Sequence, residues 1–142
     1  MRLGLAAAVG AMMAMVSVAT MAADYESGLR AFEDSDFSTA RAEWTAAGID
    51  GDARAQYELG IMLANGVGVP RDVISAYAWL MLAHKGGAPD AEDKFNALHK
   101  DYIPRHCHFD ALALVRAFET GKPEKLAAGG RQKSRCWNFK QQ

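Results

Sequence analysis

A length of 142 residues allows one small domain, and a hydrophobic share of 50% is enough to build its core. The formal net charge of −1 and the pI near 6.4 do not favour binding to a phosphate backbone, so nucleic acid is not an expected partner. After residue 23 the apolar residues recur with the helical period and no run alternates with period two, which predicts an all-α mature protein.

The first 23 residues have the layout of a secretory signal peptide. Arg2 precedes an apolar stretch rich in Ala and Met, and small residues at positions 19, 20, 22 and 23 come before the polar Asp24. An uncleaved membrane anchor is the alternative, because residues 3–23 are just long enough to cross a bilayer. No polybasic cluster or second apolar segment supports an anchor. We therefore expect cleavage near Ala22 or Ala23, no membrane insertion afterwards, and a periplasmic or secreted protein.

Four helices are expected next, at about residues 24–33, 37–47, 53–64 and 72–84. Aspartates lie at the helix boundaries, where a carboxylate can accept hydrogen bonds from free backbone N–H groups. They are Asp34, Asp36, Asp50, Asp52 and Asp72. Capping explains these carboxylates without any acid/base role.

Part of this segment recurs 36 residues later. Asp36, Ala40, Ala47 and Gly51 return as Asp72, Ala76, Ala83 and Gly87. A period of this length is typical of helical repeat proteins, which usually bind other macromolecules because each unit contributes surface rather than a reactive pocket. Gly60, the equivalent of Gly28, costs about 1 kcal/mol of helix propensity relative to Ala. We expect its missing Cβ to let the next helix approach closely.

A third, weaker unit follows, since Ala91 and Phe95 lie 36 residues after Ala55 and Leu59. Residues 91–100 and 109–120 are predicted to form a final helix pair. Its outer face is polar, as expected for a terminal unit that no neighbour covers. Residues 121–142 have the composition of a tail.

Export changes the expected state of Cys107 and Cys136, because an oxidising compartment favours a disulfide. A bridge between them would close a loop of about 30 residues, stabilise the fold by roughly 3 to 4 kcal/mol on the chain-entropy model, and tie the tail to the last helix pair. The alternative is a pair of independent thiols, one of which bridges to a partner protein, because spacing alone does not show that the two Cβ atoms meet.

The segment from Ala55 to Asp72, with the later Ala76 and Trp79, resembles a Sel1-like repeat. The small residues, the Gly-x-Gly-Val turn and the Ala-x-x-Trp helix occur together at that family's spacing. One full unit spans about residues 52–87, within a repeat domain at residues 24–120. The resemblance implies an α/α superhelix of helix-turn-helix repeats, related to tetratricopeptide repeats, that ends in a C-terminal capping helix pair. It also implies an adaptor that assembles protein complexes, often in the bacterial periplasm.

If the helices stack as this resemblance implies, the first helix of each unit lines a concave inner face. The residues expected there are Tyr25, Leu29, Arg54, Tyr57, Ile61 and Asn65. Tyrosines and aliphatic side chains aligned across two units would form an amphipathic groove for a peptide or helix of another periplasmic or envelope protein. The alternative is that the short array buries these side chains against the C-terminal segment.

A small secreted metal-binding protein is the alternative function. His106, Cys107 and His108, with His99 one or two turns earlier, could ligate copper or zinc. However, residues i and i+2 of a helix face different ways, and Cys107 cannot be both half of a disulfide and a thiolate ligand. No metal and no other cofactor is therefore assigned.

Catalysis is not expected. Some Sel1-like proteins have been described as β-lactamases, yet this chain has no Ser three residues before a Lys, no Lys-Thr-Gly and no Gly-x-Ser-x-Gly. Because nothing pairs a nucleophile with a base, the chain is predicted not to be an enzyme.

Overall fold

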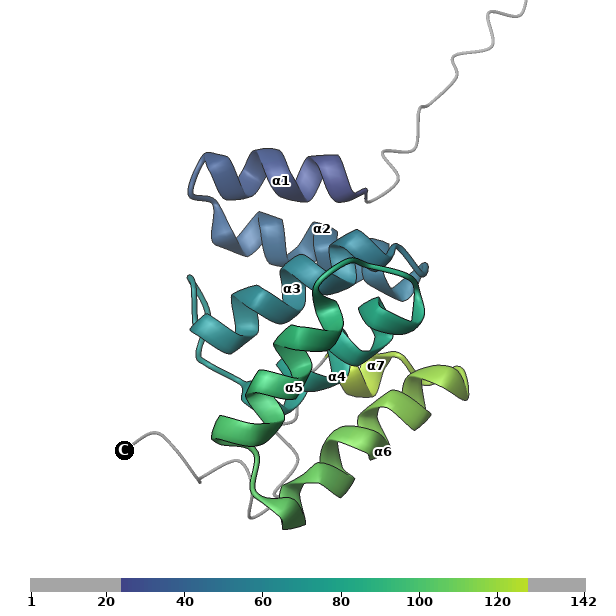
Figure 1. Cartoon of the computed structure of the whole chain (residues 1–142). Helices are drawn as coiled ribbons and strands as arrows, with labels where there is room; N and C mark the ends of the chain where they lie inside the picture. The colour runs from purple at the N-terminus through teal and green to yellow at the C-terminus, as the bar shows by residue number, and fades with distance from the viewer. Residues whose placement is uncertain (1–23, 128–142) are drawn as a thin grey trace, which may run out of the picture.

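The computed structural model describes residues 24–127, apart from the side chains of His106, Leu126 and Ala127. Within this range the chain forms helices and no strands (Figure 1), which confirms the all-α prediction. The helices are α1 (Tyr25–Glu33), α2 (Phe37–Ile49), α3 (Ala53–Asn65), α4 (Val73–Lys85), α5 (Ala91–Tyr102), α6 (His108–Glu119) and α7 (Glu124–Ala127), with a 3₁₀ turn η1 (Arg105–Cys107) before α6. The predicted signal peptide, residues 1–23, and residues 128–142 lie outside the described residues.

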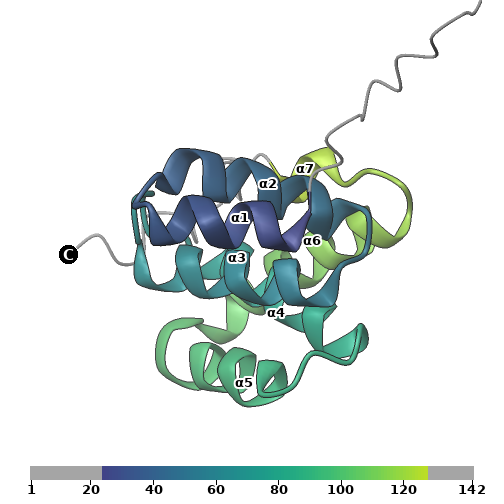
Figure 2. The ribbon, with the colours of Figure 1, turned by 90° about the horizontal axis from the view of Figure 1, so that it is seen from above.

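The first four helices stack in chain order (Figures 1 and 2). Each packs against the next, and α1 also contacts α3. The short turns between them make α1–α2 and α3–α4 two successive helix hairpins, at the positions predicted from the sequence. The superhelical path of a longer repeat array stays a prediction.

Aspartate side chains begin these four helices. Asp24, Asp36, Asp52 and Asp72 each accept a hydrogen bond from a backbone N–H group of the first helical turn. Each cap satisfies a donor that would have no partner inside the helix. Asp34 and Asp50 lie instead at the ends of α1 and α2, and their backbone N–H groups bond to the preceding turn. The prediction that these aspartates mark helix boundaries is confirmed.

Two glycines let the helices of each hairpin approach closely. A Cβ on Gly60 of α3 would lie 2.7 Å from Cγ of Leu80 on α4, and a Cβ on Gly28 of α1 would overlap the indole of Trp44 on α2. Trp44 and Leu80 are both almost completely buried and lie 36 residues apart (80−44). The two hairpins therefore repeat one contact, and the prediction for Gly60 is confirmed.

The two C-terminal helices α5 and α6 lie at the positions predicted from the sequence. α5 and α6 each pack against α4, and the two helices diverge from each other in Figure 1. A capping pair in the sense of the resemblance is therefore still a prediction. α7 lies at the start of the segment predicted as a tail, residues 121–142, most of which is outside the described residues; Pro123 precedes α7 and fixes a backbone angle that suits the start of a helix.

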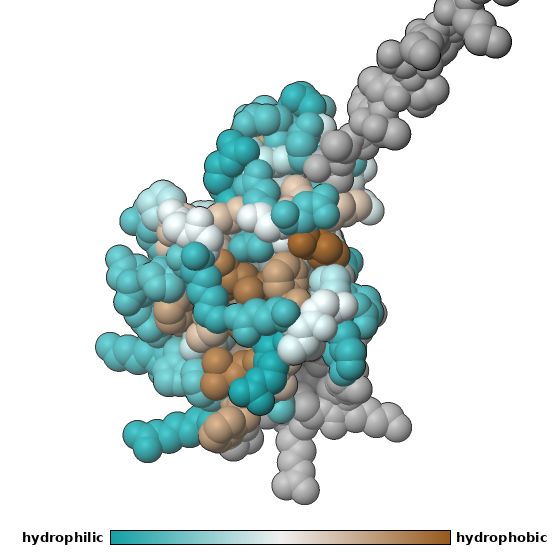
Figure 3. All heavy atoms as spheres, turned by 90° about the vertical axis from the view of Figure 1, so that its right-hand side faces the viewer, coloured by the Kyte–Doolittle hydropathy of each residue, from teal (hydrophilic) through white to brown (hydrophobic). Residues whose placement is uncertain are grey.

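Some apolar side chains remain at the surface. Phe109 is 73% exposed and Tyr102 is 37% exposed. On the face shown in Figure 3, apolar residues gather near the middle and hydrophilic residues surround them. Apolar surface of this kind is available for contacts with other molecules.

Candidate functional site

The residues predicted for the inner face lie on α1 and α3, which contact each other. The rings and aliphatic chains among them are half-buried against the core, whereas the two strongly polar side chains are exposed. The half-buried residues are Tyr25, Leu29, Tyr57 and Ile61, and the exposed ones are Arg54 and Asn65.

Arg54 is engaged by its own chain. Its guanidinium lies 4.3 Å from the ring centroid of Tyr25 and forms ion pairs with Asp52 at 3.1 Å and Glu26 at 3.5 Å. These contacts join the start of α3 to the start of α1 and hold the Tyr25 ring in place. Arg54 therefore positions this end of the inner face.

A groove of about 440 Å³ runs along the other part of the inner face, between α3 and α5. α3 contributes three predicted residues, Tyr57, Ile61 and Asn65, together with Glu58 and Ala64; Leu80 of α4 forms the floor, and Lys94, Ala97 and Leu98 of α5 form the opposite wall. Tyr25, Leu29 and Arg54 do not line the groove. The structure therefore brings together the α3 half of the predicted set and separates the α1 half from it.

α5 belongs to the C-terminal segment that the sequence analysis gave as an alternative cover for the inner face. Leu98 of α5 is buried, and the helix covers one side of the inner face while leaving a groove beside α3. The C-terminal segment thus covers some of the inner face, and Tyr57 and Ile61 still border an open groove; binding of a partner there stays a prediction. A sequence signal for α5 existed in the 36-residue spacing of Phe95 from Leu59, but it did not show which face α5 would cover.

Glu58 is a groove residue that the sequence reasoning missed. It follows Arg54 by four residues and precedes Ile61 by three, so helical spacing alone would have placed it on the same face. Within residues 24–127 its carboxylate forms no ion pair and no hydrogen bond, although Lys94 lines the same groove. Burial raises the pKa of Glu58 above its ordinary value, because the site disfavours the charged form.

The carboxylate of Glu58 lies near both tyrosines of the inner face. Burial raises the pKa of Tyr57, and the negative charges of Glu58 and Asp90 raise it further. Burial also raises the pKa of Tyr25, again with a contribution from Glu58. Glu58 therefore lies close enough to influence both rings, and it gives the inner face a negative charge that has no cationic partner in the described structure.

Two of the three histidines proposed as metal ligands lie next to each other. The rings of His99 and His108 lie 4.7 Å apart between centroids, and His108 also contacts the ring of Tyr77 at 5.6 Å. Cys107 is fully buried, and the side chain of His106 is not described. Among the described residues no group of three or more His, Cys, Asp or Glu side chains could hold a metal ion. A metal site that uses His106 stays a prediction.

Only one of the two cysteines of the predicted disulfide lies among the described residues. The described part of the chain contains no free cysteine, and Cys107 lies at the junction of η1 and α6. The predicted partner, Cys136, lies outside the described residues. The pairing of the two therefore stays a prediction.

Comparison of the chain with models of known protein families, with curated protein sequences and with solved structures finds no match. The resemblance to Sel1-like repeats therefore remains a hypothesis from sequence. Between residues 24 and 127, no helix has both the length and the apolar character needed to span a membrane.

Proposed function

We propose that this chain is an adaptor of the bacterial periplasm or envelope that binds a segment of another protein in the groove between α3 and α5. The observation that carries the proposal is the groove itself, which is lined by Tyr57, Ile61 and Asn65, three residues selected from the sequence as a binding face. Its volume of about 440 Å³ and its apolar floor at Leu80 suit one or two side chains of a docked segment.

The negative charge of Glu58 in the groove favours a docked segment that carries a basic residue. Glu58 is partly buried and has no cationic partner among residues 24–127, so a Lys or Arg of the docked segment would gain a charge-assisted hydrogen bond there. Apolar side chains of the same segment would contact Ile61 and Leu98 on the two walls. The segment is therefore an amphipathic peptide or helix with at least one basic residue on its apolar face.

Site-specific cross-linking in the native envelope tests this proposal. A photo-reactive amino acid in place of Asn65, which is exposed and lines the groove, should give a discrete adduct with one protein. The same amino acid in place of Arg116, exposed on α6, is the control and should not. Equal labelling at the two positions, or none at position 65, would contradict binding in the groove.

Two variants test the contacts inside the groove. Replacing Tyr57 and Ile61 together by Ala should abolish the adduct while leaving the chain folded, because both side chains are only half-buried. Glu58→Gln keeps the shape and removes the charge, and it should weaken the adduct strongly at low salt. Glu33→Gln, an exposed change at the end of α1, is the matched control. An adduct that survives the double replacement would exclude the groove as the binding site.

A further inference from the structure

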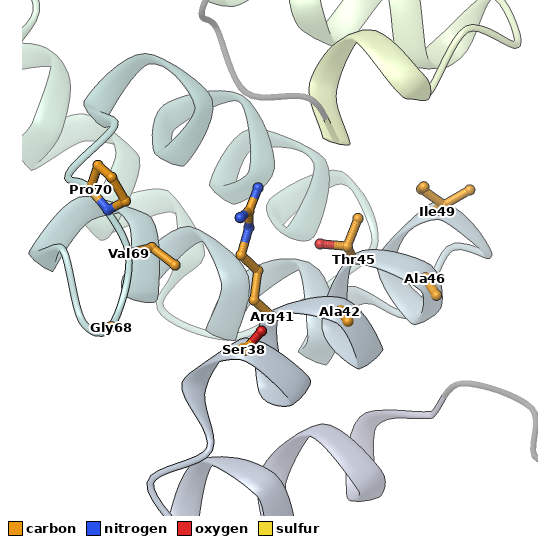
Figure 4. Close-up of a pocket in the computed structure, with 9 residues that line it drawn as sticks. All are labelled: Ser38, Arg41, Ala42, Thr45, Ala46, Ile49, Gly68, Val69 and Pro70. Atoms are coloured by element: carbon orange, nitrogen blue, oxygen red, sulfur yellow. The ribbon is translucent and has the colours of Figure 1, made fainter.

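A second pocket lies on α2 and shares no lining residue with the groove between α3 and α5. Its volume is about 530 Å³. α2 contributes Ser38, Arg41, Ala42, Thr45, Ala46 and Ile49, and the turn between α3 and α4 contributes Gly68, Val69 and Pro70 (Figure 4). The α2 residues recur every three or four positions and therefore form one face of the helix.

The turn that walls this pocket is held in place by its backbone. The N–H of Val67 donates to the carbonyl of Met62 at 3.1 Å, and the N–H of Asp72 donates to the carbonyl of Leu63 at 3.0 Å. Gly68 has a φ of 63°, and a Cβ there would overlap Phe37 at the start of α2. Glycine therefore lets the turn close against α2, and the pocket exists before any ligand arrives.

Arg41 gives the pocket a positive charge. The side chain is half-buried, and within the described residues it forms no ion pair and no hydrogen bond, whereas Arg30, Arg54 and Arg71 all donate to an oxygen of the chain. In Figure 4 the guanidinium extends from α2 between the turn and Thr45, and the hydroxyl of Thr45 points toward it. None of the described residues that line the pocket is acidic.

The rest of the lining is apolar. Ala42 and Ala46 keep the middle of the α2 face shallow, and Val69 and Ile49 border it. From Arg41 to Ile49 the helix rises about 12 Å, at 1.5 Å per residue, which is the length of an extended chain of about ten carbons, so a chain of about eight carbons fits within it. A guanidinium at one end of an apolar trough is complementary to a carboxylate that carries a hydrocarbon chain, because its planar N–H groups fit both carboxylate oxygens.

We propose that this pocket binds an aliphatic carboxylate of medium chain length, with the carboxylate on the guanidinium of Arg41 and the hydroxyl of Thr45, and the chain along Ala42, Ala46 and Ile49. The site is separate from the groove of the proposed adaptor function. Its volume lies within the usual range of about 300 to 1,000 Å³ for small-molecule sites.

Titration of the mature chain with sodium octanoate, followed by amide NMR, tests the proposal. Octanoate should shift signals of α2 and of residues 66–72, with a dissociation constant on the order of 1 mM or tighter. Octanol lacks the charge, acetate lacks the chain and octylammonium reverses the charge, so each should bind about tenfold more weakly or not at all. Octanol binding as tightly as octanoate, or shifts outside this pocket, would overturn the proposal.

Single substitutions show whether the charge of Arg41 and the shape of the pocket determine octanoate binding. Arg41→Ala should weaken octanoate binding about tenfold, and Arg41→Lys should lose less because the positive charge is kept. Ala42→Leu fills the trough at an exposed helical position and should also weaken binding. Arg116→Ala, on α6, is the control and should bind octanoate normally. Unchanged binding by Arg41→Ala, with an unchanged melting temperature, would refute the role of the guanidinium.

Discussion

The close contact between α3 and α4 predicts that Gly60→Ala destabilises the protein, although Ala favours helices. The added Cβ would lie 2.7 Å from Cγ and 3.0 Å from Cδ2 of Leu80, and 3.3 Å from the carbonyl oxygen of Ala76. Leu80 is fully buried, so its side chain has little room to move away. Helix propensity alone favours Ala by about 1 kcal/mol. Overpacking of a core costs about 1 to 3 kcal/mol.

Because the added Cβ would lie under 3 Å from a fully buried Leu80, the overpacking cost falls in the upper part of its range, about 2 to 3 kcal/mol. It therefore exceeds the propensity gain, and the expected net loss is about 1 to 2 kcal/mol of unfolding free energy. For a domain of this size that lowers the melting temperature by roughly 4 to 10 °C. Urea denaturation of the mature chain measures the loss as a lower transition midpoint with an unchanged slope. A second readout is the double variant with Leu80→Ala, in which the new methyl group partly fills the cavity, so the two changes should cost less together than their sum.

The same substitution at two further glycines should change the stability by different amounts. Gly28→Ala should cost more, because the added Cβ overlaps the rigid indole of Trp44, which also donates from Nε1 to the carbonyl of Tyr25 at 3.2 Å. Gly48→Ala should cost least, because its Cβ would lie 3.1 Å from the nearest atom, on Trp79. The reasoning fails if Gly60→Ala stabilises the protein by about 1 kcal/mol, the value expected from propensity alone.

Three other predictions concern charge, capping and the cysteines. Because burial raises the pKa of Glu58 on folding, ionisation of this carboxyl group destabilises the folded state as the pH rises. Glu58→Gln should therefore raise the melting temperature at pH 7, and this gain should disappear below about pH 4, where Glu58 is protonated in both states. A gain that persists at acid pH would contradict this prediction. Asp72→Ala should lower the free energy of unfolding by about 1 to 2 kcal/mol in urea denaturation, because its buried carboxylate accepts hydrogen bonds from the N–H and the hydroxyl of Ser75. Asp36→Ala, which removes an exposed cap, should cost less. The reverse order would refute the argument from burial. If Cys107 and Cys136 are bridged, the intact mass should lie about 2 Da below that of the reduced chain and reduction should cost about 3 to 4 kcal/mol, whereas two alkylated thiols would exclude the bridge.

Local rules predicted the first four helices well. Each begins at an aspartate cap and ends at Gly or at a backbone cap within two residues of the expected position. These signals act between neighbours in sequence, so they can be recognised without knowing the tertiary fold. The close approach at Gly60 was predictable for a related reason: glycine inside a helix is unfavourable unless packing requires it.

The arrangement of α5 and α6 depends on tertiary packing, and sequence periodicity did not determine it. Both helices have an apolar face, and periodicity shows that such a face exists without showing which neighbour covers it. The groove wall formed by Lys94 and Leu98 was therefore missed. Glu58 was missed for another reason. The sequence reasoning placed tyrosines, aliphatic residues, Arg54 and Asn65 on the binding face and left out the acidic residue one turn after Arg54.

The turn between α3 and α4 explains why the two hairpins repeat with different offsets. Gly28 and Gly60 lie 32 residues apart (60−28), whereas their contacts, Trp44 and Leu80, lie 36 apart (80−44), so the second hairpin has a turn four residues longer. In the structure the longer turn folds back on α2 through Gly68 and thereby walls the Arg41 pocket. The same insertion thus lengthens the repeat and creates a pocket that the shorter turn of the first hairpin cannot form.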